Sequence, residues 1–84
     1  MSLEALKPTI PLLIIFKGDV PREWLELGIE GLEVTSAKNG VPDISGKFVV
    51  VVGDRELAER LGVAHFTEEE AEEVSLFFEA LSLQ

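Results

Sequence analysis

Two Gly-Asp pairs follow the two most apolar stretches of this 84-residue chain: Gly18-Asp19 comes after "LLIIFK", and Gly53-Asp54 comes after "FVVVV". Two carboxylates at one edge of a sheet could hold Mg²⁺ together with a substrate phosphate, which would suit phosphoryl transfer or nuclease chemistry. Basic residues stand beside both pairs, and together with the backbone N–H groups of the turns they could instead bind a phosphate or another small anion.

The candidate anion ligands come from three short segments. They are Lys17, Gly18, Asp19 and Arg22 in the first turn, Gly53, Asp54 and Arg55 in the second turn, and Lys38 and Asn39 in a later loop. If the two apolar stretches are adjacent parallel strands, both turns lie at the topological switch point, where such sheets bind ligands. A small-anion site in this crevice is therefore one functional hypothesis.

A structural role explains the same residues with fewer assumptions. Glycine supplies the backbone freedom that a strand-to-helix turn needs, and aspartate is a favoured helix N-cap. The glycines match neither the dinucleotide-binding pattern G-x-G-x-x-G nor the P-loop. We therefore interpret Asp19 and Asp54 as helix caps, and we predict no catalytic residue, no metal site and no cofactor.

A metal-dependent enzyme is the third hypothesis, and it would use Asp19 and Asp54 as ligands. The segment "VVGDRELAERLGV", thirteen of the 84 residues, locally resembles the late strand-helix segment of PIN-type nucleases. The early strand-borne acid of that family has no counterpart in "LLIIF". The single histidine, His65, has no serine or second histidine at a catalytic or metal-binding spacing.

Four strands are predicted from the hydrophobic pattern. Residues 12–16 and, apart from Lys47, residues 47–52 are continuous apolar runs, which are typical of strands buried on both faces. Residues 31–36 alternate between apolar and polar side chains, as a half-exposed edge strand does. Residues 63–66 predict a short fourth strand.

Three helices are predicted between and after these strands. They cover residues 21–27, residues 54–62 from the Asp54 cap to a glycine stop, and residues 67–83, which begin with a Thr67–Glu70 capping box. Residues 37–46 contain Gly, Pro, Asn and Asp without a helical period, so we expect a loop there.

Strands that alternate with helices imply parallel pairing. With the two buried runs at the centre, the strand order is 2-1-3-4. We therefore predict one α/β domain over residues 1–84: a small three-layer-like sandwich with a mainly parallel four-stranded sheet and the topology β-α-β-loop-β-α-β-α. Residues 1–9 are an N-terminal arm whose pattern favours no element. The rival arrangement is an antiparallel hairpin of residues 31–36 with residues 47–52 across Asn39-Gly40.

Charge and composition disfavour several classes of partner. Sixteen acidic residues against seven basic ones give a net charge of −9, which disfavours direct binding to nucleic acid or to an anionic membrane. No apolar run approaches the ~20 residues of a membrane-spanning helix, and the N-terminus lacks a signal-peptide pattern, so we expect a cytoplasmic protein. Cysteine is absent, which rules out disulfides. Thirteen Glu with one Asn and one Gln fit a thermophile's composition.

The last predicted helix carries more apolar surface than one sheet can cover. When the other apolar residues of this helix face the sheet, four residues point away from the sheet. These partner-interface candidates are Leu76, Phe77, Ala80 and Leu83. The opposite sheet face would have thin cover, one short helix and the loop. We therefore expect a non-enzymatic module for self-association or protein interaction, with a homodimer through this helix. Alternatively, residues 1–9 fold over part of this surface.

Overall fold

A four-stranded sheet forms the centre of the protein in the computed structural model, which describes residues 11–82. The strands are β1 (Leu12–Phe16), β2 (Leu32–Ser36), β3 (Phe48–Val52) and β4 (Ala64–Phe66). Their order is β2-β1-β3-β4 and every neighbouring pair is parallel, which confirms the predicted α/β fold and strand order. The rival hairpin is wrong, because β2 pairs with β1 and lies at the edge of the sheet. The N-terminal arm at residues 1–9 lies outside the described residues.

The two apolar runs occupy the centre because a central strand is covered on both faces. In register, Ile14 of β1 lies between Val34 of β2 and Val50 of β3. The side chains of residues 13–16 and 49–52 are all buried. Strand β2 keeps its alternation, with Val34 partly buried and Glu33 exposed, as an edge strand requires.

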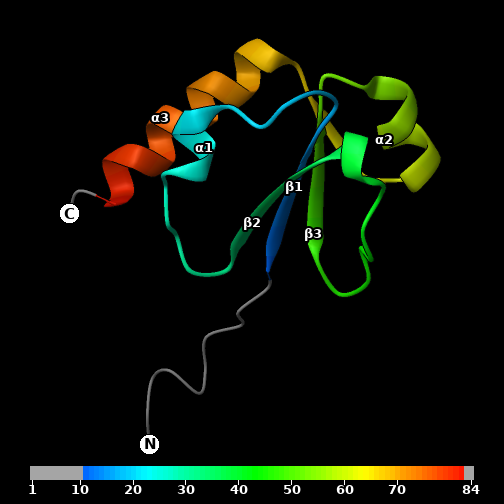
Figure 1. Ribbon diagram of the computed structural model, residues 1–84, viewed down its shortest axis with the longest axis horizontal. Coiled ribbons are helices and arrows are strands. Elements are labelled where there is room, and N and C mark those ends of the chain that lie inside the picture. The colour runs from blue at the N-terminus through cyan, green and yellow to red at the C-terminus, as the bar shows by residue number, and fades with distance from the viewer. Residues whose placement is uncertain (1–10, 83–84) are drawn as a thin grey trace, which may run out of the picture.

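Helices cover the two faces of the sheet unequally, as Figure 1 shows. Within residues 11–82 they are α1 (Arg22–Leu25), α2 (Arg55–Leu61) and α3 (Glu68–Ser82), with a short 3-10 helix, η2 (Ala37–Asn39), after β2. On one face, Trp24 of α1 and Ala71 of α3 pack on Ile14 and Val50. None of the described helices is both long enough and apolar enough to cross a lipid bilayer.

The face under α2 is better covered than the sequence predicts. Leu13, Ile15 and Val51 on this face are 0–1% exposed. Besides α2, the loop between β2 and β3 contributes Ile44, and η2 contributes Ala37. The expectation of thin cover on this face is therefore wrong, because the loop carries apolar side chains that complete the layer.

The two helices after the Gly-Asp pairs begin differently. The Asp54 side chain accepts a hydrogen bond from the Leu57 N–H at 3.1 Å, which confirms it as the cap of α2. The N-cap of α1 is Pro21, and no side chain caps this helix. The interpretation of Asp19 as a cap is therefore wrong. Pro21 has an extended backbone, so α1 starts later than predicted and spans only four residues.

The predicted capping box at the start of α3 is confirmed. The Thr67 N–H donates to Glu70 Oε1 at 2.9 Å, and the Glu70 N–H donates to Thr67 Oγ1 at 3.1 Å. Hydrogen bonds from the Thr67 backbone and hydroxyl hold the pKa of the Glu70 carboxyl below its ordinary value of 4.5. These hydrogen bonds form in the folded state, so ionisation of the Glu70 carboxyl favours folding.

Acid is expected to remove the contribution of Glu70 to stability. Because the pKa of Glu70 is lower in the folded state, its contribution is complete above pH 4.5 and is lost as the pH falls through the folded value. Urea unfolding of the wild type and of Glu70→Gln, followed by circular dichroism, measures this contribution at each pH. The difference in free energy of unfolding should favour the wild type near neutral pH and shrink well below pH 4.5. A difference that does not change with pH would contradict the assignment.

Candidate functional site

The two Gly-Asp turns begin at the same edge of the sheet, as predicted. The Lys17 N–H donates to the Val52 carbonyl at 3.0 Å, and the Gly53 N–H donates to the Phe66 carbonyl at 2.9 Å. The chain leaves β1 toward β2 and leaves β3 toward β4, so this edge is the topological switch point.

A pocket of about 320 Å³ opens beside the first turn, between α1 and α3. Its floor is apolar and is formed by buried side chains that include Phe16, Trp24 and Val52. Its polar rim consists of Lys17, Asp19, Glu23, Glu68 and Glu72. The volume is near the lower limit of small-molecule sites, which begin at about 300 Å³. The pocket therefore has room for a side chain or a very small ligand.

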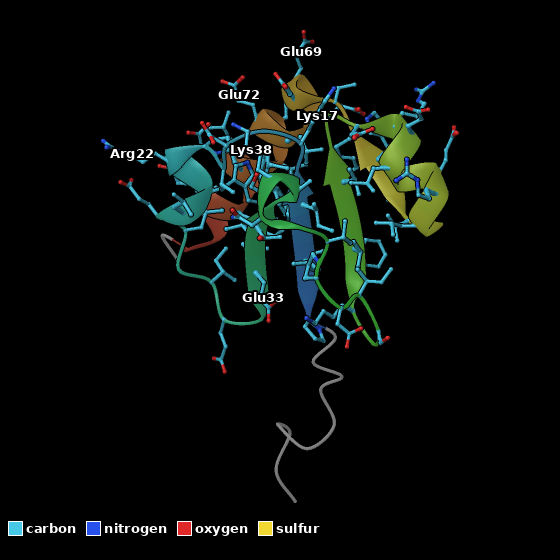
Figure 2. The ribbon with its side chains drawn as sticks, turned by 45° about the vertical axis from the view of Figure 1, so that its right-hand side comes forward. Lys17, Arg22, Glu33, Lys38, Glu69 and Glu72 are labelled. Atoms are coloured by element: carbon cyan, nitrogen blue, oxygen red, sulfur yellow. The ribbon has the colours of Figure 1, made fainter. Side chains whose placement is uncertain are left out.

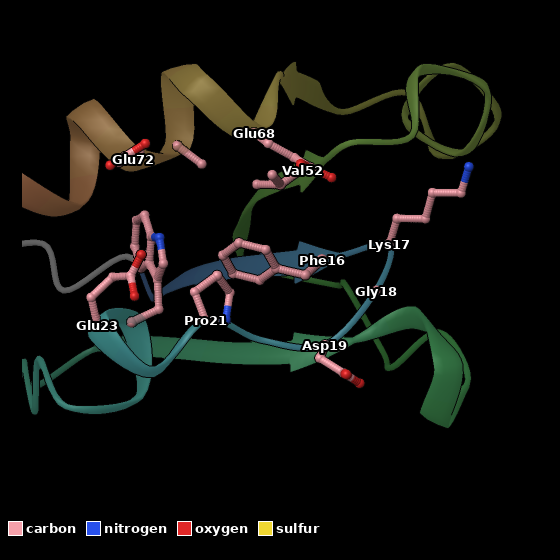
Figure 3. Close-up of a pocket in the computed structure, with 11 residues that line it drawn as sticks. Phe16, Lys17, Gly18, Asp19, Pro21, Glu23, Val52, Glu68 and Glu72 are labelled. Carbon is pink, nitrogen blue, oxygen red and sulfur yellow. The ribbon is translucent and has the colours of Figure 1, made fainter.

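The rim of this pocket is acidic. Figure 3 shows Glu68 and Glu72 on the α3 side, with Asp19 and Glu23 on the opposite side. Lys17 is the only basic residue among the described lining residues. Four carboxylates around an apolar floor repel an anion and attract a cationic group.

Glu68 also extends over the second turn. A Cβ atom built on Gly53 would lie 3.5 Å from Glu68 Oε1 and 3.7 Å from Lys17 Cβ. Gly53 has φ +83°, which L side chains rarely adopt, so the backbone conformation favours glycine here, although these distances leave room for a Cβ atom. The carboxylate of Glu68 thus lies close to the place where the anion hypothesis puts its ligand.

The remaining cations of the first turn and the loop do not join this pocket. Arg22 extends away from Lys17 (Figure 2), and its Nε lies 4.0 Å from Glu26 Oε1. Lys38 Nζ lies 3.2 Å from Asp19 Oδ1. Asn39 is exposed at the end of η2.

The second turn opens on a different hollow. Gly53 and Arg55 line an open depression of about 530 Å³ together with His65 and the start of α3. Asp54 caps α2 instead. The structure therefore divides the predicted ligand residues between two hollows that meet at Glu68, which lines both.

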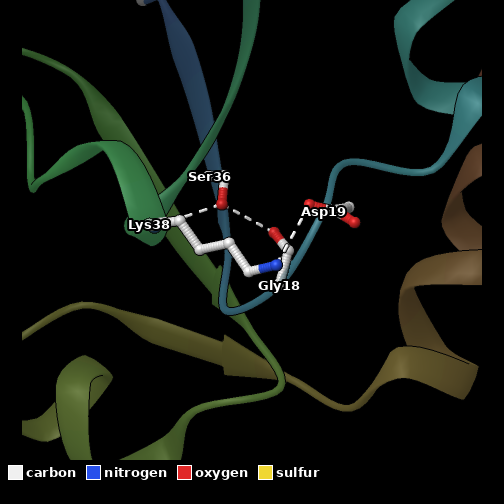
Figure 4. A network of polar contacts seen from close by, with 4 residues as sticks. All are labelled: Gly18, Asp19, Ser36 and Lys38. Carbon is white, nitrogen blue, oxygen red and sulfur yellow. Dashed lines mark hydrogen bonds and ion pairs between the residues drawn. The ribbon is translucent and has the colours of Figure 1, made fainter.

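Ser36 explains the first Gly-Asp turn, and the sequence interpretation missed it. The buried Ser36 hydroxyl donates to the Gly18 carbonyl at 2.7 Å and accepts from the Lys38 N–H at 3.1 Å. Figure 4 shows these bonds beside the Lys38–Asp19 contact. Together they attach the turn to the end of β2, which gives Gly18, Asp19 and Lys38 a structural role.

The carboxylates of the metal hypothesis already have partners. Asp19 contacts Lys38, and Asp54 accepts from the backbone of α2. Within residues 11–82, no three His, Asp or Glu side chains are grouped so that they could hold a metal ion. The hypothesis therefore has no geometric support in the described part of the chain.

A row of aromatic rings leads from the pocket floor to the surface of α3. Ring centroids are 5.7 Å apart for Phe16 and Trp24, 6.0 Å for Trp24 and Phe78, and 6.2 Å for Phe78 and Phe77, all edge-to-face. At the outer end, Phe77 is 62% exposed and its neighbour Leu76 is 60% exposed.

Three of the four predicted interface residues are thus at the surface. Ala80 is exposed one turn after Leu76, while Leu83 lies outside the described residues. We call Leu76, Phe77 and Ala80 the α3 patch. The chain matches no protein-family model, no curated protein and no solved structure in three comparisons.

Proposed function

We propose that this domain is a non-enzymatic association module that binds a protein chain, either a second copy of itself or another protein, through the α3 patch. The observation that carries the proposal is the exposure of Leu76 and Phe77, adjacent large apolar side chains that are 60% and 62% exposed. Burying such a side chain fully contributes about 1.5–3 kcal/mol. Clustered exposed apolar side chains mark interaction sites more often than single ones do.

The size of the chain supports self-association. A small domain without disulfides gains stability from association, and a twofold contact is the commonest closed arrangement. Such a homodimer would pair two α3 patches. We place its action in the cytoplasm, in line with the composition of the chain.

The small-anion hypothesis has less support. It needs basic groups in the switch-point crevice, but Lys17 shares the pocket rim with four carboxylates. Arg22 and Lys38, two further candidate cations, are paired with Glu26 and Asp19. An anion in this pocket would therefore gain little attraction.

The variant Phe77→Glu is expected to abolish self-association, because a carboxylate cannot be buried in an apolar contact without a large desolvation cost. Sedimentation velocity over a range of protein concentrations measures this. If the partner is a second copy, the wild type should change from monomer to dimer as concentration rises, and the variant should remain monomeric.

Phe48→Glu is the matched control, because Phe48 is similarly exposed, at 58%, but lies at the start of β3. It should dimerise like the wild type. If both variants behave alike, the contact is not at the α3 patch. A wild type that stays monomeric at tens of micromolar would eliminate the second copy as the occupant.

A further inference from the structure

The α3 patch is surrounded by acids of its own helix. Glu72, Glu73 and Glu79 are three or four residues from Leu76, the spacing of neighbours on a helix surface. Among residues 11–82, the carboxylates of Glu72 and Glu73 have no ion-pair partner. Any partner that covers the patch must therefore approach these charges.

Charge is distributed unequally between the two helical layers. Over residues 68–82, α3 has six Glu and no basic residue, whereas α2 has Glu56 and Glu59 balanced by Arg55 and Arg60. Figure 2 shows Glu69 and Glu72 projecting outward from α3. The excess negative charge of the described residues therefore lies mainly on the layer that carries the patch.

Two hollows lie along the seam between α1 and α3. Besides the pocket of about 320 Å³, a smaller one of about 180 Å³ is lined by Glu23, Glu26, Leu27 and Glu79. Glu23 lines both, so the two hollows adjoin. Each combines carboxylates with an apolar wall, which suits the aliphatic stem and charged end of a Lys or Arg side chain.

We propose that the occupant of the α3 patch is a basic amphipathic segment of another protein. Its apolar side chains cover Leu76 and Phe77, and its Lys or Arg side chains enter the hollows of the α1–α3 seam. This inference rests on the proposed association function and names its partner by charge complementarity, which governs specificity and the rate of encounter.

A second copy fits this surface less well. Pairing two α3 patches would bring the Glu72 and Glu73 carboxylates of both copies to one interface, and α3 supplies no base to oppose them. Like charges brought together at an interface are unfavourable, whereas a basic partner turns the same groups into attractions.

Two synthetic helical peptides with the same leucine stripe test the proposal, one with lysine at every polar position and one with glutamate. Fluorescence anisotropy of the labelled peptides measures their affinity for the full chain. The lysine peptide should bind and the glutamate peptide should not. Binding should weaken strongly at about 1 M salt, where the screening length is about 3 Å.

Variants of the protein identify the surface that binds. Glu72→Gln/Glu73→Gln should weaken binding of the lysine peptide by about 2- to 30-fold, the equivalent of two exposed ion pairs. Phe77→Ser should weaken it by about 10- to 150-fold through lost apolar burial. The matched control Glu56→Gln/Glu59→Gln, which removes the same charge from α2, should bind like the wild type.

Several outcomes would overturn the inference. An equal loss in both double variants would show general attraction to an acidic protein, and equal binding of both peptides would show that charge does not select the partner. A dimer that Phe77→Glu dissociates, with no preference for the lysine peptide, would keep the association function and refute the basic partner. If the wild type is monomeric and Phe77→Ser binds the lysine peptide as tightly as the wild type does, both the association function and the basic partner are refuted.

Discussion

Replacing Trp24 with alanine is expected to lower the free energy of unfolding by about 3–5 kcal/mol. Trp24 is 3% exposed, and its ring contacts Phe16 of β1 and Phe78 of α3 edge-to-face. It is the buried residue of α1, a four-residue helix without a side-chain cap, so the helix depends on this anchor. A domain of 84 residues has a total stability of only about 4–13 kcal/mol.

Urea unfolding followed by circular dichroism measures the loss of stability. Fluorescence cannot be used, because the substitution removes the single tryptophan of the chain. Leu25→Ala is the matched control: it shortens the next side chain of α1, which is 62% exposed, and should change stability by no more than about 0.5 kcal/mol. If the two variants are equally stable, Trp24 does not anchor α1 to α3.

The parts of the fold that were predictable depend on local patterns. The strand order followed from two runs, residues 12–16 and 48–52, because continuous apolar residues are compatible with a strand only when both faces are covered. The Asp54 cap and the Thr67–Glu70 capping box join residues three apart, so the sequence shows them directly.

The errors concern contacts between distant residues. Asp19, like Asp54, follows an apolar run and a glycine, but its carboxylate contacts Lys38 of η2, and Ser36 holds the turn from 18 residues away. Ile44 lies in a segment without periodicity, so nothing local indicates that it covers the sheet. Such contacts depend on how distant segments pack against one another in the folded chain, which a local pattern of residue types does not specify.

The acidic pocket was unpredictable for the same reason. The sequence places Lys17, Gly18 and Asp19 near one another, and these three residues do line it. The negative charge of its rim comes largely from Glu23 of α1 and from Glu68 and Glu72 of α3, two helices that are far apart in the chain. The acidic start of α3 is accounted for by the helix dipole alone, so its second role becomes visible only when α3 packs beside α1.

Shortening Ile15 to alanine is expected to lower the free energy of unfolding by about 2–5 kcal/mol. Ile15 is fully buried in β1, where it pairs with Val51 of β3 and packs in the layer under α2. A cavity at this position would open among buried side chains that include Leu13 and Val51, and the surrounding structure relaxes only partly into such a space. The cost includes both the lost burial and the cavity that remains.

Ile15→Val is the matched control, because it removes one methyl group at the same site and should cost about 0.5–1.5 kcal/mol. Urea unfolding of both variants compares the two losses. Ile44 belongs to this layer but lies in the loop between β2 and β3, outside the regular helices and strands. If Ile15→Ala costs no more than Ile15→Val, this loop must move inward to fill the space, and the layer is not the closely packed face that the buried side chains indicate.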